Sequence, residues 1–132
     1  MRKTLKLTLK KKWFDMIASG EKKEEYREIK QYWLKRITGG YVVNASDGSK
    51  CDDLTAYSTI AHNIDLLSGK WLPMKFDRVL FTNGYAKNAP KIEFEGIDIY
   101  YGEGRPEWGA NSGTIYFVIK LGREIKRTDL KY

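Results

Sequence analysis

The sequence predicts an α+β domain in which a small mixed sheet, either curled or closed into a barrel, carries two or three flanking helices. Strand patterns dominate both halves of the chain, and helical patterns occur near its start. The apolar phase of one strand region also changes across Gly96, as a β-bulge requires. Strongly bent strands of this kind suit a small barrel better than a flat sheet.

The start of the chain alternates as a half-buried strand does, with apolar residues at every second position: Leu5, Leu7 and Leu9. A helical face follows, made of Trp13, Phe14, Ile17 and Ala18. This helix is expected to end at Gly20, which suits a left-handed C′ position. A charged strand is expected over residues 22–28.

A second helical spacing ends at Gly39-Gly40 and includes Ile29, Tyr32, Trp33 and Ile37. Residues 40–75 are interpreted as a variable excursion with one short helix over 60–67, serving as a cover over the site. With this excursion included, residues 1–132 are expected to form a single domain.

Strand patterns return after the excursion, at residues 78–82 and again from Pro90. The dipeptide Asn83-Gly84 between them is typical of a hairpin turn. Residues 114–121 are almost continuously apolar, which predicts a strand buried on both faces. The last ten residues are polar and are expected to fray.

The composition is that of an ordinary soluble globular protein, with 42% hydrophobic and 31% charged residues. There is no run of 18 apolar residues, which excludes a membrane-spanning helix, and no apolar core of a signal peptide follows the first residues. The lone Cys51 forms no internal disulfide and fits a reducing cytoplasm, where we expect the protein to act.

Metal and cofactor sites have little support in the sequence. His62 is the only histidine, and neither it nor Cys51 has a partner at a catalytic or zinc-ligand spacing. Acidic residues of the excursion (Asp52, Asp53 and Asp65) lack the glycine-punctuated loop of a calcium site. We therefore expect no metal and no cofactor. The net charge of +7 instead favours a polyanionic partner.

The stretch Gly20–Glu28 holds charges of both signs directly after the predicted helix stop. Such a strand is either a solvated edge or a polar site whose charges are paired. We favour a site made of Lys22, Glu25 and Arg27. Glu25 and Arg27 share one face of a regular strand, whereas Lys22 has the opposite parity. The site therefore requires an irregular backbone just after the helix.

These residues also resemble a known family. The stretch Trp13-Phe-x-x-Ile-x-Ser-Gly-Glu-Lys-x-x-Glu-Tyr-Arg is similar to the opening signature of ASCH domains, Gly-x-Lys-x-x-Glu-x-Arg. Two later blocks resemble a bacterial and phage branch of that family: Phe76-Asp-Arg-Val-x-Phe-x-Asn-Gly-Tyr-x-Lys-x-Ala-Pro, and Gly104-Arg-x-Glu-Trp-Gly followed by Tyr116-Phe-Val-Ile. Residues 40–75 are unmatched.

The resemblance implies a PUA-like β-barrel with a cleft lined by Lys22, Glu25 and Arg27. It also implies binding of RNA or modified nucleosides. One branch of the family is an amidohydrolase that removes an acyl group from acetylated cytidine, and another member is a ribonuclease. The catalytic lysine of the amidohydrolase maps onto Lys22, but its partner threonine falls at Glu25, and a further glutamate has no counterpart here.

A second cluster follows the strand at residues 78–82. Asn83 offers a donor and an acceptor, Tyr85 a ring and Lys87 a charge, which together suit a base and its phosphate. We expect this cluster to face the first one across the cleft. Trp108 is interpreted either as a stacking platform at the rim or as a structural plug of the barrel end.

The sequence leaves three functions open. The first is a module that binds RNA or a nucleotide-like ligand, in which Lys22→Ala and Arg27→Ala weaken binding and leave thermal stability nearly unchanged. The second is an enzyme, an amidohydrolase on acylated cytidine or a metal-independent ribonuclease, in which Lys22 activates water or substrate and Glu25 transfers the proton. The third is a protein-interaction module with an apolar patch near Trp71 and Leu72.

Overall fold

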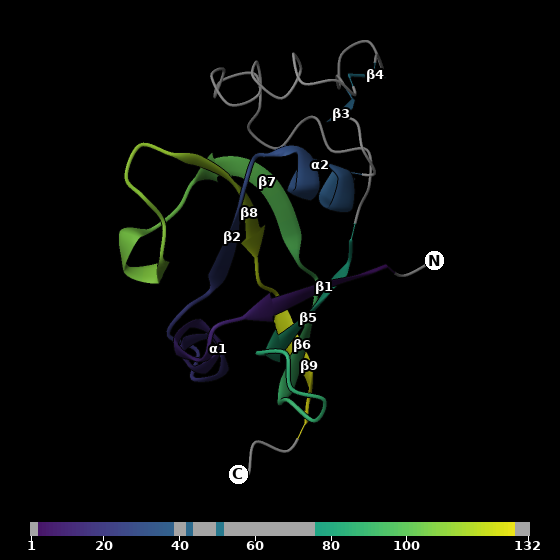
Figure 1. The fold of residues 1–132 in the computed structure, drawn as a ribbon, viewed down its shortest axis with the longest axis vertical. Helices are drawn as coiled ribbons and strands as arrows, with labels where there is room; N and C mark the ends of the chain where they lie inside the picture. Colours follow the sequence, from purple (N-terminus) through teal and green to yellow (C-terminus); the bar gives the residue numbers. More distant parts are fainter. Residues whose placement is uncertain (1–2, 39–41, 44–49, 52–75, 129–132) are drawn as a thin grey trace. The chain divides into compact units, whose positions relative to one another are not determined.

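The chain folds into strands and short helices, which together make an α+β fold. The computed structural model describes residues 3–38, 42–43, 50–51 and 76–128. Figure 1 shows the elements in chain order: β1 (Thr4–Leu9), α1 (Lys11–Ala18), β2 (Glu24–Glu28), α2 (Gln31–Thr38), β3 (Val42–Val43), β4 (Lys50–Cys51), β5 (Arg78–Asn83), β6 (Lys91–Glu95), β7 (Asp98–Glu103), the 3₁₀-helix η1 (Pro106–Trp108), β8 (Ile115–Lys120) and β9 (Arg123–Arg127). Within these ranges, no helix has the length and apolar character needed to cross a membrane.

The strands pair into separate sheets, with the orders β1-β5-β6-β9, β2-β8-β7 and β3-β4. In the largest sheet, β1 and β5 are parallel, whereas β5 and β6 and then β6 and β9 are antiparallel. The prediction of an α+β fold with a mixed sheet is therefore confirmed. These sheets do not close on themselves into a barrel among the described residues.

The described residues fall into two units, and the first comprises residues 3–25, 76–98 and 120–128. Its four-stranded sheet buries one face, and α1 packs against β1 and β5. The buried apolar side chains of this unit are Leu5, Leu7, Leu9, Phe14, Ile17, Val79, Phe81, Ala89, Ile92 and Phe94. The predicted alternation of the first strand and the apolar face of α1 both contribute to this core.

The second unit comprises the described residues from 26 to 51 and from 99 to 119. As predicted, β8 is buried on both faces, because each residue from Tyr116 to Ile119 is buried. Two tyrosine hydroxyls hold the loop between β7 and β8. The hydroxyl of Tyr26 accepts a hydrogen bond from the backbone N–H of Arg105 (3.0 Å), and the hydroxyl of Tyr116 accepts one from the backbone N–H of Asn111 (2.9 Å).

The phase change at Gly96 has a different origin from the predicted bulge. Gly96 adopts a φ of +65° in a turn that takes the chain from β6 of one sheet to β7 of another. The apolar phase changes because the two strands belong to different sheets. The register shift in this sheet lies between Glu93 and Phe94, which pair with Lys126 and Glu124 of β9.

The prediction that the last ten residues fray is wrong for residues 123–127, which form β9 at the edge of the sheet. Backbone pairing with β6 and side-chain bonds hold this polar strand, including the Arg127 guanidinium on the carbonyl of Ala18 (2.8 Å). An edge strand needs no apolar alternation, because its ladder hydrogen bonds are made by the backbone. Most of the excursion over 40–75, with the predicted helix at 60–67, lies outside the described residues; β3 and β4 form a short antiparallel pair.

Candidate functional site

The end of α1 directs Lys22 back toward the helix. Gly20 adopts a φ of +86°, as its predicted place after the helix stop requires, and its N–H bonds to the carbonyl of Ile17 (3.1 Å). The N–H of Lys22 then bonds to the carbonyl of Met16 (3.0 Å). The chain is therefore irregular before β2 begins at Glu24. This is the irregular backbone that the predicted site required.

Lys22 and Glu25 form a buried ion pair. The Nζ atom of Lys22 lies 3.1 Å from Oε1 of Glu25, with side-chain exposures of 0% and 7%. The same ammonium lies 4.9 Å from the ring centroid of Trp13, on α1. A buried charge is tolerated when it is paired, and an aromatic face adds further attraction for a cation. The sequence left two alternatives for the charged segment, a solvated edge or a polar site with paired charges. Lys22 and Glu25 fit the second alternative.

Burial changes what substitution of Lys22 should do. Lys22→Ala would leave the carboxylate of Glu25 buried next to a cavity, which is strongly destabilising. The expectation that this variant keeps its thermal stability therefore does not fit the structure. A binding experiment has to remove both charges together.

Arg27 lies in the second unit, on the second half of β2. Its guanidinium donates a hydrogen bond to the carbonyl of Tyr26 (2.8 Å) and lies 5.0 Å from the ring centroid of Trp33 on α2. The side chain is half-buried and rests on an aromatic ring, where its planar donors are held in a defined orientation.

Asn83, Tyr85 and Lys87 lie where β5 ends and the connection to β6 begins. Asn83 is the last residue of β5, and β6 starts at Lys91, one residue after the predicted start at Pro90. The N–H of Asn83 bonds to the carbonyl of Pro90 (2.9 Å), and the N–H of Gly84 bonds to that of Leu9 (3.0 Å), just before α1. Tyr85 is 93% exposed and Lys87 is exposed, so both are accessible to a ligand.

Trp108 is a partly buried side chain of the second unit. It packs against the cluster formed by Tyr26, Ala110, Tyr116 and Val118. The guanidinium of Arg105 lies 4.8 Å from the centroid of the Trp108 ring. Of the two alternatives for this residue, its position fits the structural one, because it extends an aromatic core.

The described residues contain no group of three or more His, Cys, Asp or Glu side chains that could hold a metal ion. Cys51 is part of β4, whereas His62, Asp52, Asp53 and Asp65 lie outside the described residues. The proposed patch near Trp71 and Leu72 also lies outside them.

Two features of the structure were missed by the sequence interpretation. The sequence places Trp13 on the apolar helix face and in the ASCH-like signature, and in the structure its ring also lies beside the ammonium of Lys22. The glycine-induced reversal after α1 was the signal, because it returns the chain toward the helix that carries Trp13. The second feature is a depression on the four-stranded sheet, lined by Leu80, Lys91, Glu93, Lys126 and Thr128. It is formed by strands that are distant in sequence.

Comparison of this chain with protein-family models, with curated proteins and with solved structures found no match in any of the three. Function is therefore inferred from the motif residues and from the geometry of the site.

Proposed function

We propose that this protein is a cytoplasmic RNA- or nucleotide-binding domain of the ASCH type, with the Lys22–Glu25 pair at the centre of its ligand site. The observation that carries the proposal is the burial of this pair, 3.1 Å apart, beside Trp13. Lys22 and Glu25 occupy two positions of the Gly-x-Lys-x-x-Glu-x-Arg motif. Trp13 belongs to the same opening signature.

Stability alone is a poor reason for such a pair. Removing two charges from water costs several kcal/mol per ion, and apolar side chains of similar size are often equally or more stabilising. A pair that is held in place without a net gain in stability is a reasonable candidate for recognition. An ammonium supplies hydrogen-bond donors and a carboxylate supplies acceptors, as the polar edge of a base requires.

The surroundings in the first unit fit a nucleic-acid ligand. The net charge of +7 favours phosphate-bearing partners through counterion release. Tyr85 and Lys87 combine an exposed ring and a cation on one loop, as proteins that stack single-stranded bases do. In the second unit, Arg27 is a separate candidate for contact with the same class of ligand, whereas Trp108 packs on the aromatic cluster of that unit.

We further propose that the complete fold is a PUA-like barrel. The mixed four-stranded sheet and the sharp turn at Gly96 support this architecture. An experimental structure of the full chain tests it: continuous backbone hydrogen bonding around a closed sheet is the expected result, and open sheets throughout would contradict it.

The test of function compares two double variants that each remove one ion pair and leave the net charge unchanged. Lys22→Met/Glu25→Leu removes the buried pair. Lys11→Met/Asp15→Leu removes an exposed pair on α1, whose charged atoms lie 2.6 Å apart. Binding to a fluorescein-labelled single-stranded RNA is followed by anisotropy over a range of salt concentrations, and circular dichroism confirms that each variant is folded.

We expect the wild-type chain to bind this RNA with an affinity that falls as salt rises. The Lys22→Met/Glu25→Leu variant should bind at least tenfold more weakly, and the Lys11→Met/Asp15→Leu variant should remain within about twofold, because its exposed pair lies outside the site. Wild-type affinity in a folded Lys22→Met/Glu25→Leu variant would assign the pair to the fold and remove the proposal.

The second candidate is an amidohydrolase on acylated cytidine, or less favourably a metal-independent ribonuclease. The observation in its favour is an acid and a base within hydrogen-bonding distance and out of bulk water. Against it, an ammonium in an ion pair has no lone pair with which to accept a proton. Incubation with acetylated cytidine and with single-stranded RNA tests both reactions, and absence of turnover with either leaves the binding function.

A further inference from the structure

The outward face of the sheet β1-β5-β6-β9 is polar and basic. Because alternate residues of a strand point to opposite faces, the residues between the core positions point outward. The register places one outward row across all four strands, in the order Lys6, Leu80, Glu93 and Lys126. With an inter-strand spacing of about 4.8 Å, this row is roughly 14 Å long and has a lysine at each end.

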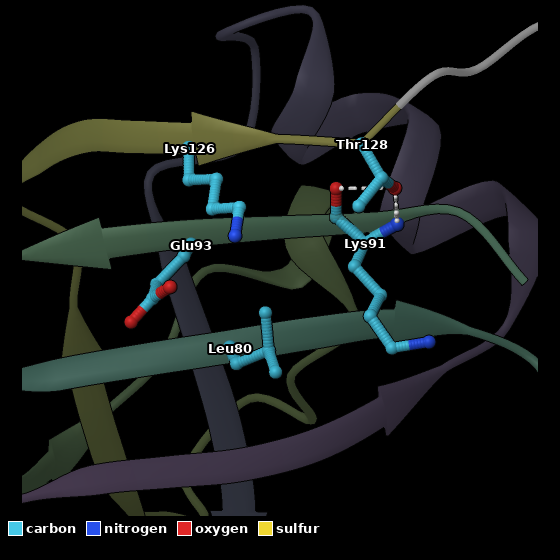
Figure 2. Close-up of a pocket in the computed structure, with 5 residues that line it drawn as sticks. All are labelled: Leu80, Lys91, Glu93, Lys126 and Thr128. Carbon is cyan, nitrogen blue, oxygen red and sulfur yellow. Dashed lines mark hydrogen bonds between the residues drawn. The ribbon is translucent and has the colours of Figure 1, made fainter.

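A depression of about 120 Å³ lies on this face. Figure 2 shows the side chain of Leu80 standing on β5 between those of Glu93 and Lys91, while Lys126 extends from β9 toward β6. Thr128 fixes the edge, because its hydroxyl accepts a hydrogen bond from the N–H of Lys91 (2.7 Å) and donates one to the carbonyl of the same residue (3.2 Å). Leu80 and the aliphatic parts of the lysines make the surface of the depression largely apolar.

The charges around the depression do not cancel. The carboxylate of Glu93 lies 3.8 Å from the guanidinium of Arg78, so an arginine already balances it. In the described ranges, the ammonium groups of Lys91 and Lys126 form no ion pair, and that of Lys91 has a long hydrogen bond to the carbonyl of Ala89 (3.4 Å). The ligand that complements this surface is an anion with a small apolar or planar body.

We propose that this depression binds one nucleotide unit, with a ring against Leu80 and the phosphate between Lys91 and Lys126. An apolar cavity of about 150 Å³ admits benzene, so a volume near 120 Å³ that is open to solvent suits a single six-membered ring. The carboxylate of Glu93 accepts a hydrogen bond from a base N–H. This inference rests on the proposed function and adds to it a second, separate contact surface for the same class of ligand.

Free nucleotides and residues within a strand share this chemistry, and the experiment has one arm for each. Uridine 5′-monophosphate and an oligouridylate of about ten residues are titrated into the full chain by calorimetry, with uridine as the ligand that lacks phosphate. The test variant is Lys91→Gln/Lys126→Gln. The control is Lys35→Gln/Lys120→Gln, which removes the same charge from exposed positions outside the four-stranded sheet.

We expect the Lys91→Gln/Lys126→Gln variant to bind the oligouridylate at least tenfold more weakly and with a smaller salt dependence. The control variant should stay within about threefold of wild type. A matching loss for uridine 5′-monophosphate, with no binding of uridine, extends the site to free nucleotides. Loss confined to the oligouridylate restricts it to strand residues.

Unchanged binding of the oligouridylate by the test variant, or equal losses in the test and control variants, would overturn the inference. Failure of the proposed function has a different signature. In that case the oligouridylate is sensitive to Lys91→Gln/Lys126→Gln and insensitive to Lys22→Met/Glu25→Leu. A wild-type chain that binds neither ligand would overturn both.

Discussion

The ammonium of Lys22 lies 3.1 Å from the carboxylate of Glu25, and neither side chain has more than 7% of its surface exposed. Two charges so close to each other and so far from water depend on each other. Removing one leaves the other buried without its partner of opposite charge in this pair, whereas removing both takes the two charges out of the site. This coupling is measurable before any ligand is known.

Lys22→Ala should therefore lower the free energy of unfolding by about 3–5 kcal/mol, the usual cost of breaking a buried pair. Lys22→Met/Glu25→Leu should unfold close to wild type or above it. Urea denaturation measures both values. A double variant that loses as much stability as Lys22→Ala, or a Lys22→Ala variant as stable as wild type, would contradict this coupling.

The exposed ring of Tyr85 gives a prediction about binding alone. The side chain is 93% exposed, so Tyr85→Ala should leave the unfolding midpoint unchanged. If one base stacks on the ring, the variant should bind single-stranded RNA about tenfold more weakly, which is within the range for one stacked base. Tyr32→Ala, at an exposed tyrosine of α2, is the matched control and should bind as wild type. Equal affinity of wild type and Tyr85→Ala would exclude stacking at this loop.

Tyr101 makes stability fall at alkaline pH. Its buried hydroxyl has no hydrogen-bond partner among the described residues, and burial raises the pKa of Tyr101 above its ordinary value of 10.0. Above about pH 10 the unfolded chain ionises at this residue while the folded chain keeps the proton. The folded state then binds more protons, so stability present below pH 10 is lost as pH rises.

Comparison of wild type with Tyr101→Phe isolates this effect from the other tyrosines. Between pH 10 and 11, wild type should lose up to about 1.4 kcal/mol more stability than the variant. At pH 8 the variant should be as stable as wild type or more stable, because it loses a buried hydroxyl that no other described residue satisfies. Urea denaturation at the two pH values gives both numbers, and parallel losses in the two proteins would contradict the assignment.

Gly122, between β8 and β9, has no room for a side chain. A Cβ atom there would lie 2.5 Å from the carbonyl oxygen of Gly96 and closer still to that of Glu95. Because both contacts are with backbone atoms, which cannot rotate away as a side chain can, Gly122→Ala should lower the free energy of unfolding by about 1–3 kcal/mol or more. No described residue lies within 4 Å of the methyl group that Gly113→Ala adds, and the φ of +78° at this position opposes the change by about 1–2 kcal/mol. Thermal unfolding ranks the two variants, and a Gly122→Ala protein as stable as wild type would show that β9 can shift.

Local patterns were enough to predict several elements. Each of these elements is recognisable from a few neighbouring residues. β1 shows the alternation of Leu5, Leu7 and Leu9, and β8 shows an apolar run. The helix stop shows a glycine where the backbone needs a positive φ, at Gly20. Lys22 and Glu25 were proposed as site residues from the charges that follow the helix. Their burial was not predictable, because it depends on the elements that cover them.

The polar strand β9 and the depression beside it could not be predicted from local sequence patterns. Neither has an apolar period, and the depression combines side chains of β5, β6 and the end of β9. The register that aligns Leu80, Glu93 and Lys126 is set by backbone hydrogen bonds between strands. Such bonds are open to any residue type and leave little trace in composition.

By itself, the sequence determined the α+β class, the early strand and helix, the turn at Gly20 and the basic character of the chain. Only the tertiary structure decided that β1 pairs with β5, that β9 completes the sheet, and that Lys22 and Glu25 are removed from water beside Trp13. The physical reason is the distance along the chain over which each effect acts. Apolar periodicity and the backbone preference of glycine depend on a few neighbouring residues, whereas strand pairing and burial depend on segments brought together from distant parts of the chain.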